Sequence, residues 1–211
     1  MSKEKQNKAV IFLNAVIVLF TVIGLVFMLT GNAKDGALQS SGIENFKFYT
    51  VLSNVFCGIV AAIYLCCICL KGDVDKLIPL KLGAVCCVTI TFSVVAFMFG
   101  PLYGFTQFYQ RGNLFFHLLL PVVAMIEFVV IRRKNIPFRY AVFAAIPTLL
   151  YGVGYMTNIL INGMGGEWPD TNDFYAFLNW GWPVGIMIFA GITLSAFGVA
   201  CLFRHISNKK S

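Results

Sequence analysis

The sequence predicts an all-α membrane protein with six transmembrane helices, forming a single domain over residues 1–211. Hydrophobic residues make up 59% of the chain and charged residues only 12%, whereas soluble domains are about half apolar and a quarter charged. A soluble fold of 211 residues has too much surface to bury such a composition. Six separate stretches are also apolar over about 20 residues, the length that a helix needs to cross a bilayer. These observations exclude a disordered chain, a disulfide scaffold and a soluble enzyme.

The expected spans are residues 9–30, 48–70, 78–99, 113–131, 140–161 and 182–203. Each is expected to be a helix, because lipid offers the backbone no hydrogen-bond partner outside its own segment. The first span is longer than the core of a signal peptide and is followed by no small-residue cleavage site, so we expect it to remain a membrane helix. The sixth span carries Pro183 in its first turn, where proline is well tolerated.

Basic residues set the expected orientation, because cytoplasmic segments of membrane proteins are enriched in lysine and arginine. Thirteen basic residues fall on one side of the predicted membrane: Lys3, Lys5, Lys8, Lys71, Lys76, Lys81, Arg132, Arg133, Lys134, Arg139, Arg204, Lys209 and Lys210. Only Lys34, Lys47 and Arg111 fall on the other side. We therefore expect both termini to be cytoplasmic, and the short chain and sparse tails are typical of a bacterial inner-membrane protein. The net charge of +7 then reflects topology and contact with membrane lipids, and no nucleic-acid partner is expected.

All seven cysteines fall inside predicted spans, so no structural disulfide is expected. They are Cys57, Cys66, Cys67, Cys69, Cys86, Cys87 and Cys201. Their clustering permits a metal site, but the favoured interpretation is that they serve as small apolar packing residues. No metal or cofactor is implied, because no set of ligands converges in the sequence.

Ionisable side chains inside a bilayer are costly and are therefore candidates for function. Two are predicted to lie there, His117 and Glu127, both in the fourth span. Thr50 lies just inside the second span, and both of these spans run from the outer side inward. Thr50 and His117 should each lie roughly 3–6 Å from the outer boundary, at 1.5 Å per residue. We expect the two side chains to face each other at one depth.

This pair suits nucleophilic chemistry on a lipid ester. A hydroxyl needs a base within hydrogen-bond reach, and a histidine can take its proton and return it to a leaving group. Thr50 shares a helix face with Ser53 and Asn54, and His117 shares one with Asn113, so these three polar residues are candidates to stabilise an oxyanion. The structural alternative is that His117 bonds a neighbouring helix and Thr50 caps its own.

A proline and an acid follow the histidine in the fourth span. Pro121 should bend the helix and deprive the carbonyl of His117 of its usual partner, which is tolerated only against protein or a wet cavity. Glu127 lies about 15 Å further along the helix, too far to orient the imidazole. We expect Glu127 to form an ion pair at the cytoplasmic edge with basic residues of the next loop: Arg132, Arg133 and Lys134.

Two outer loops are rich in aromatic residues. Residues 100–112 fit an interfacial aromatic belt, or alternatively a lid over a lipid entrance. Residues 162–181 are acidic and aromatic and lie on the same predicted side as Thr50 and His117.

Short motifs in this order resemble the family of androgen-induced and androgen-dependent membrane proteins. They are Lys47-Phe48-Tyr49-Thr50, Ser53-Asn54, Asn113-Leu114-Phe115-Phe116-His117 followed by Pro121 and Glu127, and Tyr175-Ala176-Phe177-Leu178. The resemblance implies an intramembrane threonine hydrolase that cleaves fatty-acid esters of hydroxy fatty acids, with Thr50 as nucleophile and His117 as its partner. Leu118 and Leu119 depart from the hydroxyl-bearing residues expected there, which leaves the identity of the lipid ester open.

Two other classes of function fit the same sequence. A non-enzymatic lipid or small-molecule binder or transporter could use the same outer pocket, although the lack of internal repeats and of charged pathway residues speaks against ion coupling. A structural or assembly protein is the third reading, with glycines such as Gly181 and Gly185 at helix contacts.

Overall fold

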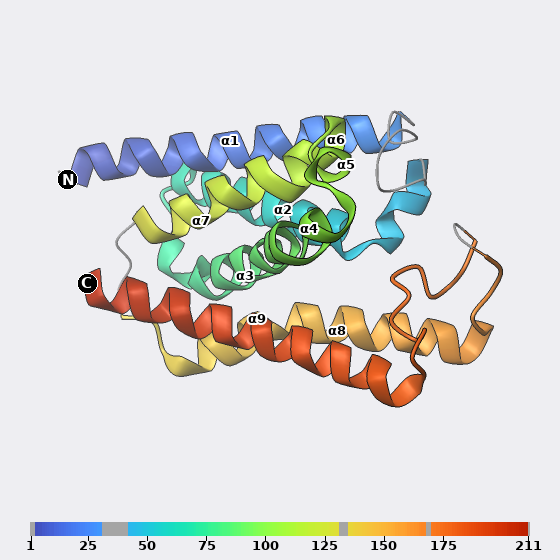
Figure 1. Ribbon diagram of the computed structural model, residues 1–211. Coiled ribbons are helices and arrows are strands. Elements are labelled where there is room, and N and C mark those ends of the chain that lie inside the picture. Colours follow the sequence, from blue (N-terminus) through green and yellow to red (C-terminus); the bar gives the residue numbers. More distant parts are fainter. Residues whose placement is uncertain (1–2, 31–41, 131–134, 168–169, 211) are drawn as a thin grey trace.

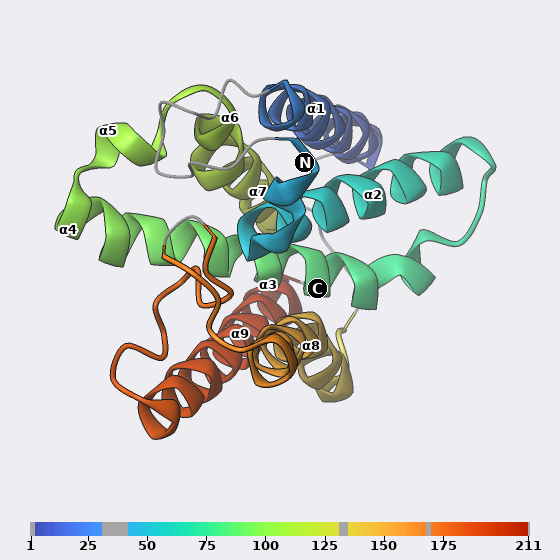
Figure 2. The same ribbon diagram turned by 90° about the vertical axis from the view of Figure 1, so that its right-hand side faces the viewer.

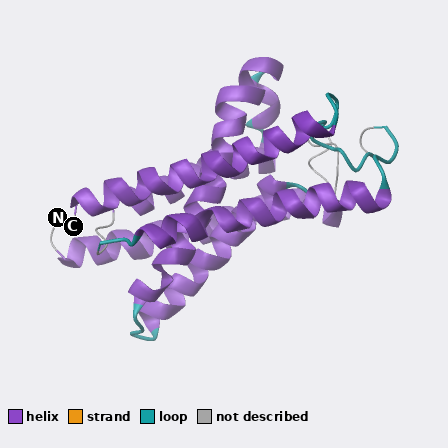
Figure 3. Ribbon diagram, turned by 90° about the horizontal axis from the view of Figure 1, so that it is seen from below, coloured by secondary structure: helices purple, strands orange, loops and turns teal. Residues whose placement is uncertain are grey.

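The computed structural model describes residues 3–30, 42–130, 135–167 and 170–210. This part of the chain consists of helices and loops without a strand (Figure 3). Six helices are long and apolar enough to span a membrane, and all six coincide with the expected spans: Gln6–Leu29, Tyr49–Cys69, Val74–Tyr103, Arg111–Val130, Phe138–Asn162 and Trp182–Lys209. The described residues therefore have the all-helical structure and the six long apolar helices that a multi-pass membrane protein requires.

Four of the spans are single helices: α1 (Lys3–Leu29), α2 (Tyr49–Cys69), α8 (Phe138–Asn162) and α9 (Trp182–Lys210). The helix α9 runs through the expected tail, so His205 lies on its exposed surface. The helix α1 begins and α9 ends at the same end of the bundle (Figure 1). An even number of spans accounts for this arrangement; that the end is cytoplasmic remains a prediction from the basic residues.

The other two spans are composite. The third contains η2 (Val74–Leu77), α3 (Ile78–Val94), η3 (Val95–Phe99) and α4 (Gly100–Tyr103). The fourth contains α6 (Arg111–Leu114), η4 (Phe115–Leu119) and α7 (Leu120–Val130), and the short helix α5 (Phe105–Phe108) joins the two spans. A further short helix, η1 (Gly42–Lys47), leads into α2.

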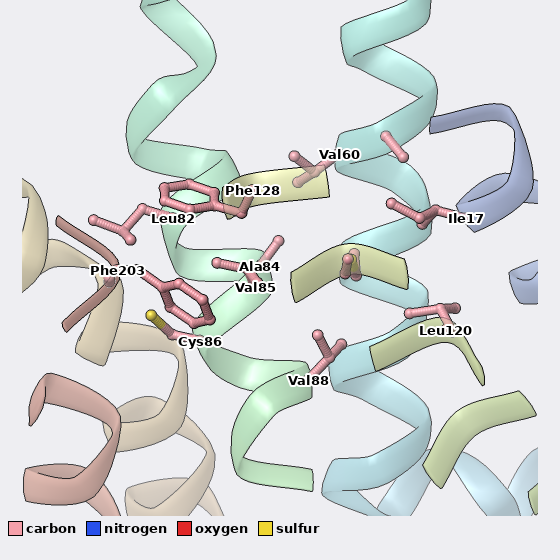
Figure 4. Close-up of a cluster of buried hydrophobic side chains, with 14 of the residues drawn as sticks. Ile17, Val60, Leu82, Ala84, Val85, Cys86, Val88, Leu120, Phe128 and Phe203 are labelled. Atoms are coloured by element: carbon pink, nitrogen blue, oxygen red, sulfur yellow. The ribbon is translucent and has the colours of Figure 1, made fainter. Parts of the chain in front are cut away.

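The helix α3 lies at the centre of the bundle. It separates α1, α2 and α7 on one side from the α8–α9 pair on the other (Figure 2). Its side chains Leu82, Val85 and Val88 are fully or almost fully buried and point among Phe128, Phe203 and other apolar groups (Figure 4). Because lipid is as apolar as these groups, close packing rather than removal from water holds the helices together.

Two turns of π-helix interrupt the composite spans, and each is followed one residue later by a proline. In η3 the N–H of Gly100 bonds the Val95 carbonyl, and in η4 the N–H of Leu120 bonds the Phe115 carbonyl. Both bonds span five residues, the spacing of a π-helix. The next residue in each case is a proline, which has no N–H to continue the pattern.

The structure has a π-turn immediately before Pro121, where the sequence predicted a bend, and the carbonyl that loses its partner is a different one from the one expected. At π spacing the missing N–H of Pro121 would have paired with Phe116, one residue before His117. The Phe116 carbonyl instead accepts from Asn54 Nδ2 at 2.9 Å. With α-helical spacing the carbonyl without a partner would be that of His117; π spacing moves it to Phe116.

Glu127 has two buried partners that the sequence did not suggest. Its Oε1 lies 3.2 Å from Lys81 Nζ and accepts from Asn14 Nδ2 at 3.1 Å, and Lys81 also donates to Asn14 Oδ1. All three side chains are buried between α1, α3 and α7. The expected partners of Glu127, Arg132, Arg133 and Lys134, lie outside the described residues. Lys81, one of the thirteen basic residues assigned to the cytoplasmic side, is a buried partner of Glu127.

Candidate functional site

A cavity of about 430 Å³ is lined by residues of several helices. These include the first turn of α2, which lies at the end of the bundle away from the start of α1 and the end of α9 (Figure 1). The cavity walls come from the start of α2, the end of α3 with η3 and α4, α5, η4, α8, α9 and the segment after α8. Among the residues that line it are Thr50, Thr91, Met98, Phe108, His117, Thr148, Tyr151, Phe174, Tyr175, Ile188, Ile192 and Thr193. The lining is predominantly apolar and aromatic, with a few hydroxyls and one imidazole, a composition that suits a lipid chain bearing one polar group.

Thr50 and His117 both line this cavity, as their depths in the sequence predicted. Thr50 is in the first turn of α2, which begins one residue earlier after Phe48 in an extended conformation. His117 is at the middle of the η4 π-turn and only 3% of its surface is exposed. Such π-turns are found frequently at functional sites.

The hydrogen bonding of His117 fixes which ring nitrogen carries the proton. Its Nδ1 lies 2.9 Å from the Phe108 carbonyl, which can only accept, so Nδ1 carries the proton and donates. In the neutral ring Nε2 is then the unprotonated nitrogen. Among the described residues Nε2 has no hydrogen-bond partner, so an imidazole that lines the same cavity as Thr50 keeps an unprotonated nitrogen able to accept a proton.

The three oxyanion candidates do not line the cavity. Ser53 Oγ donates to the Thr50 carbonyl at 3.1 Å and is also bonded to Thr91 Oγ1 at 2.9 Å, so its single proton is already used. Asn54 uses its amide hydrogens on two backbone carbonyls. Asn113 is buried, and its Oδ1 has no partner among the described residues. The oxyanion donors thus stay unassigned among these side chains.

Both aromatic loops contribute side chains to the cavity wall; for residues 100–112 the sequence had favoured an interfacial belt over a lid. From the first loop, Tyr103, Gln107 and Phe108 line the cavity, and the Phe108 carbonyl also holds His117. From the second loop, Phe174, Tyr175 and Phe177 cover the cavity beside α8.

Asp173 organises the second loop. It was not predicted to do so, because nothing in the local sequence distinguishes it from a solvent-exposed loop acid. Its Oδ1 accepts from Tyr155 Oη at 2.5 Å and from the Phe177 N–H at 3.0 Å, and its Oδ2 accepts from the Leu178 N–H at 2.9 Å. Only 4% of the Asp173 surface is exposed. The carboxylate therefore holds the aromatic wall of the cavity in place.

Tyr175 ties this loop to the helix that carries Thr50. Its hydroxyl accepts from the Tyr49 N–H at 2.9 Å, which is one of the N–H groups left without an intrahelical partner at the start of α2. Nearby, Tyr151 Oη donates to the Lys47 carbonyl at 2.7 Å, and Tyr49 Oη bonds Thr148 Oγ1 at 2.7 Å. Burial raises the pKa of Tyr175 to about 12, so its phenol stays neutral at physiological pH.

The described residues contain no group of three or more His, Cys, Asp or Glu side chains placed to hold a metal ion. Compared with models of known protein families, with curated proteins and with solved structures, the chain has no significant match. Its function must therefore be argued from the site.

Proposed function

We propose that this protein is an intramembrane lipid-ester hydrolase in which Thr50 is the nucleophile and His117 the general base. The observation that carries the proposal is that Thr50 and His117 line the same cavity. The Nδ1 proton of His117 is bonded to the Phe108 carbonyl, which leaves Nε2 unprotonated and able to act as a base. An imidazole oriented in this way is the usual companion of a hydroxyl nucleophile.

The proposed substrate is an ester of a long-chain fatty acid. The apolar and aromatic lining favours an acyl chain, and only a few hydroxyls and His117 can meet a polar ester group. The resemblance to the androgen-induced and androgen-dependent membrane proteins points to fatty-acid esters of hydroxy fatty acids as the class to test first. The reaction requires no metal or cofactor in this proposal.

In the first half-reaction, Nε2 of His117 takes the proton from Thr50 Oγ1 as that oxygen attacks the ester carbonyl carbon. The tetrahedral intermediate collapses when the C–O bond to the alcohol breaks, and His117 returns the proton to the departing alkoxide. In the second half-reaction, water loses a proton to Nε2 and attacks the acyl-threonine ester. Collapse releases the fatty acid and restores both side chains.

Hydrolysis by the purified protein in lipid nanodiscs tests this proposal. Thr50→Ala and His117→Ala should each reduce kcat by at least about a hundredfold, because the nucleophile and base act as one unit. Thr30→Ala and His205→Gln are the matched controls, since they remove the same groups at exposed positions outside the cavity. If Thr50→Ala and His117→Ala fold and hydrolyse esters at the wild-type rate, the catalytic assignment is wrong.

A lipid or small-molecule carrier that uses the same cavity is the second candidate. The lack of charged residues within the spans had spoken against ion-coupled transport. The buried Lys81–Glu127 pair supplies such residues and therefore favours this second candidate. Esters that bind in the cavity of the wild type and are recovered intact would favour this candidate.

A further inference from the structure

We infer that Asn54 is a positioning residue that joins the nucleophile's helix turn to the π-turn carrying the base. This inference rests on the proposed function, but its geometry is independent of any substrate. Asn54 is one turn after Thr50 on α2 and is completely buried. Its side chain therefore bonds to protein groups and is never in contact with bulk solvent.

The amide nitrogen of Asn54 bridges two backbone carbonyls from different helices. Nδ2 donates to the Thr50 carbonyl at 2.7 Å and to the Phe116 carbonyl at 2.9 Å. The two carbonyl oxygens can therefore be no farther apart than these two bond lengths combined. Phe116 immediately precedes His117, so a single side chain sets the approach of the backbone that carries Thr50 to the backbone that carries its base.

The Phe116 carbonyl is available for this bond because of the local sequence. In the η4 π-turn its partner would be the N–H of residue 121, and Pro121 has none. A buried carbonyl without a hydrogen-bond partner is destabilising, so the Phe116 carbonyl requires a donor from another helix. Asn54 is that donor, at a point that lies next to His117.

The same geometry argues against an oxyanion role for Asn54. A side-chain amide has two N–H groups, and here both are directed at carbonyl acceptors. The assignment of nitrogen and oxygen is fixed, since an amide oxygen at that position would face two carbonyl oxygens. The remaining Oδ1 has no partner among the described residues, and as an acceptor it would repel an oxyanion.

The test compares Asn54→Leu and Asn54→Ser with Thr21→Val. Leucine has a similar volume and no donor, while serine is too short to reach both carbonyls. The control variant Thr21→Val also removes a buried side-chain bond to a helix carbonyl, that of Thr21 Oγ1 to Ile17, and keeps the side-chain volume. It therefore matches the loss of a buried hydrogen bond without touching the bridge.

In the hydrolysis assay, both Asn54 variants should lower kcat by at least about tenfold and change KM by less than about threefold, because misplacing the pair weakens the reaction more than lipid binding. Thr21→Val should leave both constants near wild type. Equal effects of Asn54→Leu and Thr21→Val on kcat, in variants of equal thermal stability, would overturn the inference.

A second measurement needs no substrate. In a Thr50→Cys background, the rate at which N-ethylmaleimide alkylates residue 50 is followed by peptide mass spectrometry across pH. His117→Gln should slow this reaction severalfold by removing the base, and Asn54→Leu should slow it to a similar extent. If Asn54→Leu reacts as fast as the Thr50→Cys parent, Asn54 does not position the pair.

The two measurements separate the inference from the proposed function. A wild-type protein that hydrolyses no ester, combined with an alkylation rate that depends on both His117 and Asn54, would contradict the hydrolase and support the positioning role. Thr50-dependent hydrolysis that is unchanged by Asn54→Leu would support the hydrolase and contradict the positioning role.

Discussion

The buried cluster of Lys81, Glu127 and Asn14 yields a quantitative prediction about stability. The ammonium and carboxylate are 3.2 Å apart, with side-chain exposures of 5% and 2%. Asn14 bonds both of them, so each charge has a charged and a neutral partner. The perturbation is to remove one charge, as in Lys81→Met or Glu127→Leu, or both charges together.

The expected magnitude follows from the separation. At 3.2 Å and an effective dielectric constant of about 20, the attraction is about 5 kcal/mol. Removing one partner also leaves the other charge buried, and such changes cost about 3–5 kcal/mol. Replacing both charges by apolar side chains removes the attraction and the desolvation penalty together. The double variant should therefore be within about 1 kcal/mol of the wild type.

The assay is a double-mutant cycle on unfolding in mixed detergent micelles, with sodium dodecyl sulfate as denaturant and circular dichroism as the signal. The coupling between Lys81 and Glu127 should be about 3 kcal/mol or more. Lys76→Met and Glu44→Gln are the controls, because these exposed residues should each change stability by less than about 0.5 kcal/mol. Single variants that lose less than about 1 kcal/mol, or additive effects, would refute the reasoning.

Three further predictions concern the cavity wall and helix packing. Tyr175→Phe removes the acceptor for the Tyr49 N–H and should destabilise the protein by about 0.5–1.5 kcal/mol. Because the pKa of Tyr175 is raised to about 12 in the folded protein, the neutral phenol contributes its full share of the unfolding free energy below pH 10, and this share is lost as pH rises toward 12. The stability advantage of wild type over Tyr175→Phe, measured by chemical denaturation, should therefore shrink over that range. Asp173→Ala leaves Tyr155 Oη and two loop N–H groups without their acceptor and should speed chymotrypsin cleavage of residues 163–181 by at least about tenfold. Equal cleavage rates would contradict the organising role of Asp173. Gly58→Ala places a methyl group against Thr21 of α1 and should lower the unfolding free energy by about 1–3 kcal/mol in the detergent assay. Adding Thr21→Ala should relieve the clash, and a neutral Gly58→Ala would contradict the close approach of α1 and α2.

The six spans could be read from the sequence because bilayer thickness constrains the length and hydropathy of every helix. Position along the spans also predicted that Thr50 and His117 lie at a similar depth, and the two residues line one cavity in the structure. Pro121 predicted a disturbance near His117, but the sequence does not distinguish an α-helical bend from a π-turn. That one-residue change in spacing moved the free carbonyl to Phe116.

The pairing of polar side chains between helices could not be predicted from the sequence. Asn14 and Glu127 are 113 positions apart, and Lys81 lies at a span boundary where it resembles a topology-setting loop charge. Asp173 was likewise indistinguishable from a solvated loop acid until the segment folded around it. Such contacts depend on how the helices pack, whereas local patterns report only which segments are helices.

The covalent labelling of Thr50 tests the central claim most directly. The purified protein is treated with a long-chain fluorophosphonate, which forms a stable phosphonyl ester with an activated hydroxyl, and the modified residue is identified by peptide mass spectrometry. We predict that the adduct is on Thr50, that Thr50→Ala abolishes it, and that His117→Gln slows it at least about tenfold while His205→Gln does not. Folded wild-type protein that is unlabelled, or that is labelled equally well in Thr50→Ala, would contradict the Thr50–His117 mechanism.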